Sequence, residues 1–166
     1  MAKLDYGPAI ELLKGAHTVA ICGHVNPDGD ALGSVLALTC ALRSAGYQVT
    51  PLLATRERPH LYDFLYAYEE LTPACEYGAV PDVFISVDVP SIQRTGDGVY
   101  VFNRARKTIA IDHHQGPADF ANVNLVDDGA AAAGMLVWDF IGRAGIERTP
   151  DIATCCYTAL VTDTGR

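Results

Sequence analysis

The residues best placed to do chemistry are one imidazole and two carboxylates within a seven-residue stretch: His24, Asp28 and Asp30. They follow a short apolar run at 17–21, which indicates a buried strand, and they precede a segment with the apolar spacing of a helix. Loops from strand to helix lie at the carboxyl ends of strands, where open α/β sheets bind ligands. This loop could therefore offer three ligands to a divalent cation.

The same loop also has an ordinary structural interpretation. Asp30 could cap the helix that follows it, and the sequence Asn-Pro-Asp-Gly at 26–29 is typical of a turn. Short motifs occur by chance. Taken alone, the loop leaves both the metal site and the capping turn open.

Three more polar sites follow apolar segments. The strand predicted at 83–87 ends at Asp88, and the strand predicted at 108–111 ends at the triplet Asp112-His113-His114. Asp163 comes near the end of the last predicted helix. Because the carboxyl ends of neighbouring parallel strands lie along one edge of a sheet, groups that are remote in sequence can converge there.

Convergence would make a cation necessary. A buried cluster of four carboxylates repels itself strongly unless cations neutralise it, and carboxylates mixed with imidazoles suit manganese or magnesium. So many ligands exceed what a single ion needs if it must also bind substrate and water. Two metal ions about 3.5–4 Å apart, bridged by a carboxylate, would fit and could activate water as a nucleophile on phosphorus. Asp88 is the natural bridge, since it has no close acidic neighbour in sequence.

Each of these residues has a simpler alternative. Asp88 stands before Val89-Pro90 and could be a turn residue. His113 and His114 could lie on the surface, and Asp163 could be an ordinary polar helix end. Their joint occurrence, each directly after an apolar segment, favours a common site.

The rest of the chain predicts the elements that would position these groups. Apolar patterning predicts strands at 18–22, 47–53, 82–88, 107–111 and 122–126, and helices at 5–14, 30–44, 59–68, 130–144 and 151–162. This alternation indicates an α/β fold, with a mainly parallel sheet of about five strands flanked by helices on both faces.

Finer expectations concern single residues within these elements. Pro51 suggests an edge strand or a strand end, and Pro90, Gly96 and Gly98 mark loop and turn. Two sets of apolar residues are expected to face inward from helices: Tyr62, Phe64, Leu65 and Tyr68 in the first, and Met135, Leu136, Trp138 and Ile141 in the second.

Bulk properties narrow the class of protein. The 166 residues, 49% of them hydrophobic and 19% charged, fit one globular domain. With no apolar run near the roughly 20 residues that span a bilayer and no apolar signal core at the N-terminus, we expect a cytoplasmic protein. The net charge of −8 argues against a long nucleic-acid duplex as partner. The five cysteines are odd in number and lack Cys-x-x-Cys spacing, which disfavours disulfides and zinc knuckles.

On these motifs the chain resembles the DHH phosphoesterase superfamily. The match lies in the segment 24–34, then Val87-Asp88, Asp112-His113-His114 and the segment 162–165. The first motif is most similar to the branch of nanoRNases and 3′-phosphoadenosine-5′-phosphate phosphatases. That branch includes cyclic-di-AMP phosphodiesterases and lies near RecJ-type exonucleases, while family II inorganic pyrophosphatases share the architecture with a different first motif.

The resemblance implies a role for each residue. His24 and Asp28 would bind one manganese ion, with magnesium as the other choice, while Asp88 would bridge to a second ion held by Asp30, His113 and Asp163. Asp112 would orient His113, and His114 would contact the scissile phosphate or act as a general acid. A hydroxide activated by two metals would release nucleoside 5′-monophosphates from short oligonucleotides, or phosphate from 3′-phosphoadenosine-5′-phosphate.

Members of this branch also carry a C-terminal DHH-associated domain that grips the substrate. We therefore expect residues 1–166 to be the catalytic DHH domain of a longer protein, without that second domain. Hydrolysis of cyclic dinucleotides, pyrophosphate or polyphosphate stays open, as does a homodimer. So does a module that binds metal and nucleotide but turns nothing over without its second domain.

Overall fold

A parallel sheet of six strands forms the centre of the fold. The computed structural model describes residues 4–116 and 119–165. Its strands are β1 (Thr18–Cys22), β2 (Gln48–Leu53), β3 (Thr72–Pro73), β4 (Val83–Val87), β5 (Lys107–Asp112) and β6 (Val123–Val126). Every neighbouring pair is parallel, in the order β3-β2-β1-β4-β5-β6. The predicted α/β class and parallel sheet are confirmed, and the strand beyond the expected five is the two-residue β3.

The strand order places a topological switch point between β1 and β4. From β1 the chain winds outward to β3, then returns to β4 beside β1 and winds outward the other way to β6. Connections therefore leave the two central strands in opposite directions, which opens a crevice at their carboxyl ends. Any group that directly follows β1 or β4 lies beside that crevice.

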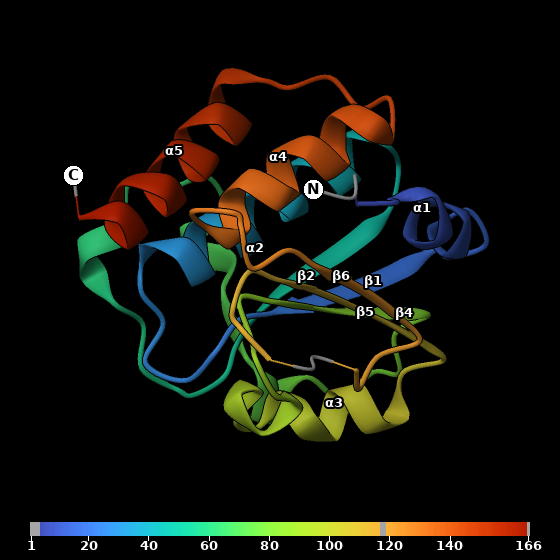
Figure 1. Ribbon diagram of the computed structural model, residues 1–166. Helices are drawn as coiled ribbons and strands as arrows, with labels where there is room; N and C mark the ends of the chain where they lie inside the picture. The colour runs from blue at the N-terminus through green and yellow to red at the C-terminus, as the bar shows by residue number, and fades with distance from the viewer. Residues whose placement is uncertain (1–3, 117–118, 166) are drawn as a thin grey trace.

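Helices cover both faces of the sheet (Figure 1). They are α1 (Gly7–Leu13), α2 (Gly29–Ser44), α3 (Gly98–Arg104), α4 (Ala133–Arg143) and α5 (Pro150–Thr164). Because strand side chains alternate, Val19 and Ile21 enter the large core with α2, α4 and α5, while Ala20 and Cys22 enter a smaller core with Val101 of α3. None of the helices in the described part of the chain is both long and apolar enough to span a membrane.

Helix α2 is buried on nearly all sides. Thirteen of its sixteen residues are buried, because it lies between the sheet and the outer helices α4 and α5. Small residues permit this close packing: a Cβ at Gly33 would collide with the carbonyl oxygen of Cys155, and one at Gly134 would collide with the Cβ of Ala159. The three helices therefore fix one another's positions.

Two sequence predictions in the connecting segments are wrong. Residues 59–68 do not form a regular helix, but include the 3₁₀ turn His60–Tyr62 and lead into a second, Tyr68–Glu70. Tyr62, Leu65 and Tyr68 are three residues apart and turn inward, together with Tyr66 and Ala67. The backbone N–H groups of Leu65 and Tyr68 donate to the carbonyls of Tyr62 and Leu65, which is the pattern of 3₁₀ turns. Phe64 does not fit that spacing and is 62% exposed.

The region after Pro90, predicted as loop and turn, contains the short helix α3. Its sequence, Gly-Val-Tyr-Val-Phe-Asn-Arg, has low helix propensity, so burial of Val101 against the sheet decides its structure. Met135, predicted to face inward from α4, is 44% exposed, whereas Leu136 and Ile141 are buried. Pro51 lies within β2, at a position that β3 does not reach, since β3 pairs only with Leu52 and Leu53.

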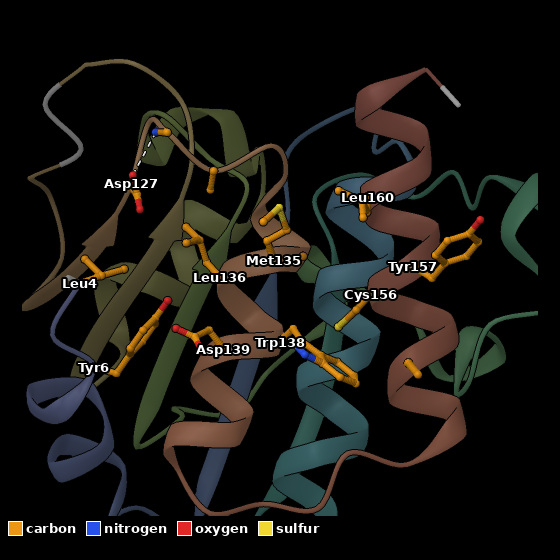
Figure 2. A pocket seen from close by; sticks show the side chains of 14 residues that line it. Leu4, Tyr6, Asp127, Met135, Leu136, Trp138, Asp139, Cys156, Tyr157 and Leu160 are labelled. Atoms are coloured by element: carbon orange, nitrogen blue, oxygen red, sulfur yellow. Dashed lines mark hydrogen bonds between the residues drawn. The ribbon is translucent and has the colours of Figure 1, made fainter. Parts of the chain in front are cut away.

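An apolar groove of about 830 Å³ lies over α4 and α5 (Figure 2). Its lining includes Tyr6 from the N-terminal segment, Met135 and Trp138 from α4, and Tyr157 and Leu160 from α5. The groove contains none of the eight residues singled out for chemistry. Those residues lie elsewhere, at the edge of the sheet.

The contact between α2 and α5 gives a prediction for stability. Gly33→Ala should lower the free energy of unfolding by about 1–3 kcal/mol, because the new Cβ meets α5 backbone that cannot move aside freely. Urea unfolding followed by circular dichroism would measure the change. Gly78→Ala is the matched control, since a Cβ there meets nothing within 4 Å. Equal stability of the two variants would contradict the packing argument.

Candidate metal centre

The structure brings all eight predicted site residues to the carboxyl edge of the central strands. His24 follows β1 by two residues, Asp88 directly follows β4, and Asp112 is the last residue of β5. Asp28 and Asp30 lie at the start of α2. The remaining three side chains come from the loop after β5 and from the last turn of α5: His113, His114 and Asp163.

Two groups of three side chains that share no residue could each hold a cation, and Asp88, His113 and His114 form a third group that overlaps both. In the first, His24 Nε2 lies 3.7 Å from an oxygen of Asp28 and 3.3 Å from Oδ2 of Asp88. In the second, His113 Nε2 lies 3.4 Å from Asp30 Oδ2 and 3.6 Å from Asp163 Oδ2. Within each group the potential ligand atoms lie within 4.8 Å of one another.

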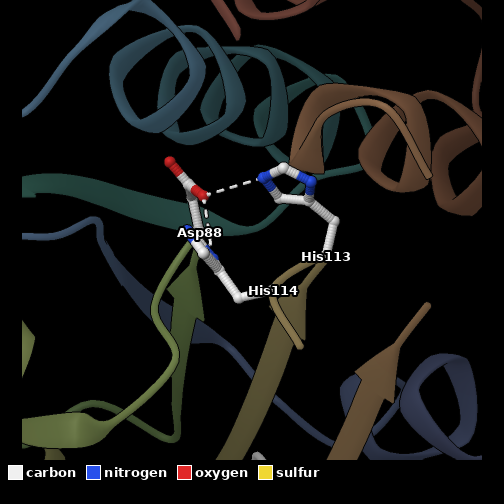
Figure 3. Close-up of side chains that lie close together, drawn as sticks. All are labelled: Asp88, His113 and His114. Carbon is white, nitrogen blue, oxygen red and sulfur yellow. Dashed lines mark ion pairs between the residues drawn. The ribbon is translucent and has the colours of Figure 1, made fainter. Parts of the chain in front are cut away.

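Asp88 lies between the two groups. Its Oδ2 faces His24, while its Oδ1 lies 3.4 Å from His113 Nε2 and 3.5 Å from His114 Nδ1 (Figure 3). The residue is buried and adopts the left-handed backbone conformation, with φ of 58°. Aspartate tolerates that conformation better than most residues. Asp88 is thus both a turn residue, as the simpler interpretation had it, and the side chain that the two groups share.

Asp28 also has both a structural and a chemical environment. Its Oδ1 accepts hydrogen bonds of 3.0 Å from the backbone N–H groups of Asp30 and Ala31, so it caps α2. The capping role considered for Asp30 therefore belongs to Asp28. Asp30 instead lies in the first turn of α2, with its side chain fully buried.

Main-chain groups of one segment hold two of the side chains in place. The backbone N–H groups of Ala133 and Gly134 donate to the Asp30 carboxylate at 2.7 and 2.9 Å. His113 Nδ1 lies 3.2 Å from the carbonyl oxygen of Ala130. None of these groups was singled out from the sequence, because a main-chain donor or acceptor can come from any residue type.

The partner of Asp112 differs from the expectation. Asp112 was expected to orient the ring of His113. From His113, however, it accepts a hydrogen bond only from the backbone N–H, which lies 2.9 Å from Oδ1. The same oxygen lies 2.7 Å from Nδ1 of His114. Asp112 therefore orients the His114 ring, and the Ala130 carbonyl orients that of His113.

Proton affinities in the cluster reflect its charges. Burial alone would lower the pKa of His24, but its contacts with Asp28 and Asp88 raise it to about 10. Contact with Asp88, aided by the charge of Asp30, raises the pKa of His113 to about 9. Burial raises the pKa of Asp30 to about 7. Burial also opposes ionisation of Asp88, yet the two imidazoles hold its pKa well below the usual value.

The environment of His113 fits a divalent cation. Since Nδ1 faces a carbonyl oxygen, it must carry a hydrogen, and Nε2 is the atom turned toward the carboxylates. Nε2 is buried with no hydrogen-bond partner among the described residues, although oxygens of Asp30, Asp88 and Asp163 lie 3.4–3.6 Å away. The raised pKa of His113 indicates that, in the metal-free chain, a proton on Nε2 faces these three carboxylates. A divalent cation bound among the four groups would take the place of that proton and neutralise more of the negative charge.

Comparisons with known proteins find relatives in sequence and in fold. The bifunctional oligoribonuclease and PAP phosphatase NrnA of Thermus thermophilus is 34% identical over 157 residues, covering 93% of this chain and 46% of that protein. The structure of an exopolyphosphatase-related protein from Bacteroides fragilis has a TM-score of 0.89 at 25% identity, covering 99% of this chain and 52% of the other.

A more distant likeness extends to the fold alone. The structure of exonuclease RecJ bound to manganese has a TM-score of 0.56 at 22% identity, over 97% of this chain and 44% of the other. The chain thus spans about half the length of each of these three proteins. A family model described as the DHH family, N-terminal domain, matches residues 18–160. With most of its length in that match, the chain belongs to the DHH family.

Proposed function

We propose that this chain carries the catalytic centre of a metal-dependent phosphoesterase. The substrates would be short oligonucleotides, cleaved to nucleoside 5′-monophosphates, or 3′-phosphoadenosine-5′-phosphate, which would lose a phosphate. The observation that carries the proposal is the position of Asp88, whose two oxygens face the two different groups of ligands. The names of the relatives support the substrate class, because NrnA is described as an oligoribonuclease and PAP phosphatase.

Two divalent ions, manganese or magnesium, are proposed as cofactors. His24 and Asp28 would hold one, Asp30, His113 and Asp163 the other, and Asp88 both. Such ions, when bound, neutralise the carboxylates, lower the pKa of a coordinated water and bind phosphate oxygens. RecJ, which has a similar fold at 22% identity, is described as bound to manganese.

His114 is proposed to act on the substrate directly. Its side chain is 43% exposed, whereas that of Asp112 beside it is almost fully buried. Because Asp112 engages Nδ1 at 2.7 Å, Nε2 is left to contact a phosphate oxygen or to give a proton to the leaving group. Asp112 would act as a positioning residue that fixes the plane of this ring.

One observation favours a second candidate substrate. The protein with the TM-score of 0.89 is described as exopolyphosphatase-related, and inorganic polyphosphate presents the same tetrahedral phosphorus without a base. Both candidate substrates would present a phosphate to the ligand groups described above, so these groups favour neither. Turnover of inorganic substrates must therefore be compared directly with that of nucleotides.

The proposal predicts the behaviour of Asp88→Ala. Wild-type chain with manganese should hydrolyse a dinucleotide or 3′-phosphoadenosine-5′-phosphate faster than pyrophosphate or polyphosphate. Asp88→Ala should lose at least about 100-fold in kcat/KM, because even partners of direct ligands are worth 10–100-fold. The exposed Asp63→Ala serves as control for loss of a carboxylate. Product release would be measured by chromatography, with folding checked by circular dichroism.

The same experiment separates the alternatives. Faster turnover of polyphosphate would select the second candidate. Two manganese ions bound without turnover would indicate a metal-binding module that needs a further domain. Near-wild-type activity of Asp88→Ala would refute the shared role of this carboxylate.

Metal affinity should depend on pH. Contacts with the carboxylates raise the pKa of His24 to about 10 and that of His113 to about 9, so both rings are protonated in the metal-free chain at neutral pH. A cation must displace these protons, so apparent manganese affinity should rise between pH 6 and 8, by up to about tenfold per pH unit for each proton displaced. Calorimetry in buffers of different ionisation enthalpy would count the protons released. An affinity independent of pH would show that the imidazoles are not ligands.

A further inference from the structure

Asp30 is surrounded by hydrogen-bond donors from two helices. Its Oδ1 accepts from the Gly134 backbone N–H at 2.9 Å and from the Ser34 hydroxyl at 3.2 Å. Its Oδ2 accepts from the Ala133 backbone N–H at 2.7 Å. Ser34 is itself fully buried, one helical turn after Asp30 on α2.

Counting acceptor positions shows what remains for a cation. A carboxylate has about four lone-pair positions, two on each oxygen. Ser34 and Gly134 occupy both positions on Oδ1, and Ala133 occupies one on Oδ2. A single position is left, on the oxygen that lies 3.4 Å from His113 Nε2.

We propose that Ser34 is a positioning residue of the metal centre. Together with the first turn of α4, it restricts Asp30 to binding one cation through one oxygen, Oδ2. The inference rests on the proposed function, because it assumes that Asp30 is a metal ligand. It goes further by assigning the Ser34 hydroxyl a role in selecting which oxygen binds.

Helix packing makes this arrangement rigid. The residue before α4, Ala132, has no side-chain cap, so the Asp30 carboxylate supplies from α2 the cap that α4 lacks. Gly134 lets α4 pack closely on α5, since a Cβ at this position would collide with Ala159 of α5. Rotation of the carboxylate would break hydrogen bonds to both helices, and the Ser34 hydroxyl is the one side-chain contact among them that substitution can remove.

The test is Ser34→Ala, with Ser44→Ala as the matched control. Ser44 lies at the far end of the same helix, and its hydroxyl donates to the Ala41 carbonyl rather than to a carboxylate. Manganese binding would be titrated by calorimetry, with free manganese counted by electron paramagnetic resonance. Ser34→Ala should weaken one of the two binding steps by about tenfold or more and leave the other unchanged, as expected for a partner of a direct ligand.

A second measurement separates an effect on metal affinity from an effect on the stability of the fold. Thermal unfolding of each variant would be measured in EDTA and again with saturating manganese. The rise in Tm on adding manganese should be smaller for Ser34→Ala than for wild type or Ser44→Ala, since this rise depends on metal affinity for the native state.

The outcomes separate the inference from the function on which it rests. If Ser34→Ala binds both ions as wild type does, or loses affinity for both alike, the positioning role of Ser34 is refuted while the metal centre stands. If wild-type chain binds no divalent ion, the proposed function fails and this inference fails with it. A loss of manganese affinity that is confined to one binding step in Ser34→Ala, and that Ser44→Ala does not show, supports the positioning role of Ser34.

Discussion

Mutual repulsion of carboxylates is the constraint on which the rest of this structure depends. Asp28, Asp30, Asp88 and Asp163 converge on two imidazoles at one edge of the sheet. In a largely buried site, such charge is tolerated only with compensating donors and cations. The structure supplies donors from two helix N-termini: α2 caps itself with Asp28, and α4 is capped by Asp30. These donors leave His113 Nε2 buried without a hydrogen-bond partner among the described residues, 3.4–3.6 Å from oxygens of Asp30, Asp88 and Asp163.

The sheet explains why this charge gathers at one place. Winding outward in both directions from β1 and β4 leaves these two strands side by side with their connections diverging. Groups that follow them in sequence, His24 and Asp88, therefore meet although more than sixty residues separate them. The large apolar groove on α4 and α5 contributes no ligand. The polar site and this apolar groove are therefore at different places on the described part of the chain.

The convergence of the site could be predicted from sequence because it depends on strand ends. Short apolar runs identify strands, and parallel strands bring their carboxyl ends together whatever the loops do. The partners of each side chain could not be predicted in the same way. Whether Asp112 meets the ring of His113 or that of His114 depends on the backbone path after β5, which no periodicity records. For the same reason, no pattern in the sequence indicated that the backbone N–H groups of Ala133 and Gly134 would donate to Asp30.

Predictions of secondary structure were wrong where tertiary contacts overrule the local conformational preference of the residues. The spacing of Tyr62, Leu65 and Tyr68 is compatible with both an α-helix and 3₁₀ turns, and the backbone hydrogen bonds between residues three apart distinguish them. Helix α3 has a strand-like composition and is helical because it covers the smaller core. One signal was available and not used: Ser34 stands four residues after Asp30, the spacing at which helical side chains meet.

The wide separation of the ligands along the chain bears on how the protein matures. The second ligand group combines Asp30, at the start of α2, with Asp163, which lies fourteen residues after Thr149, the N-cap of α5. During synthesis from the N-terminus, the sheet and α2 can assemble before α5 is made. The second ligand group is therefore complete only when α5 docks on α2, whereas the members of the first group, His24, Asp28 and Asp88, all precede α5 in the chain. Cation uptake by the second group would then report the docking of α5.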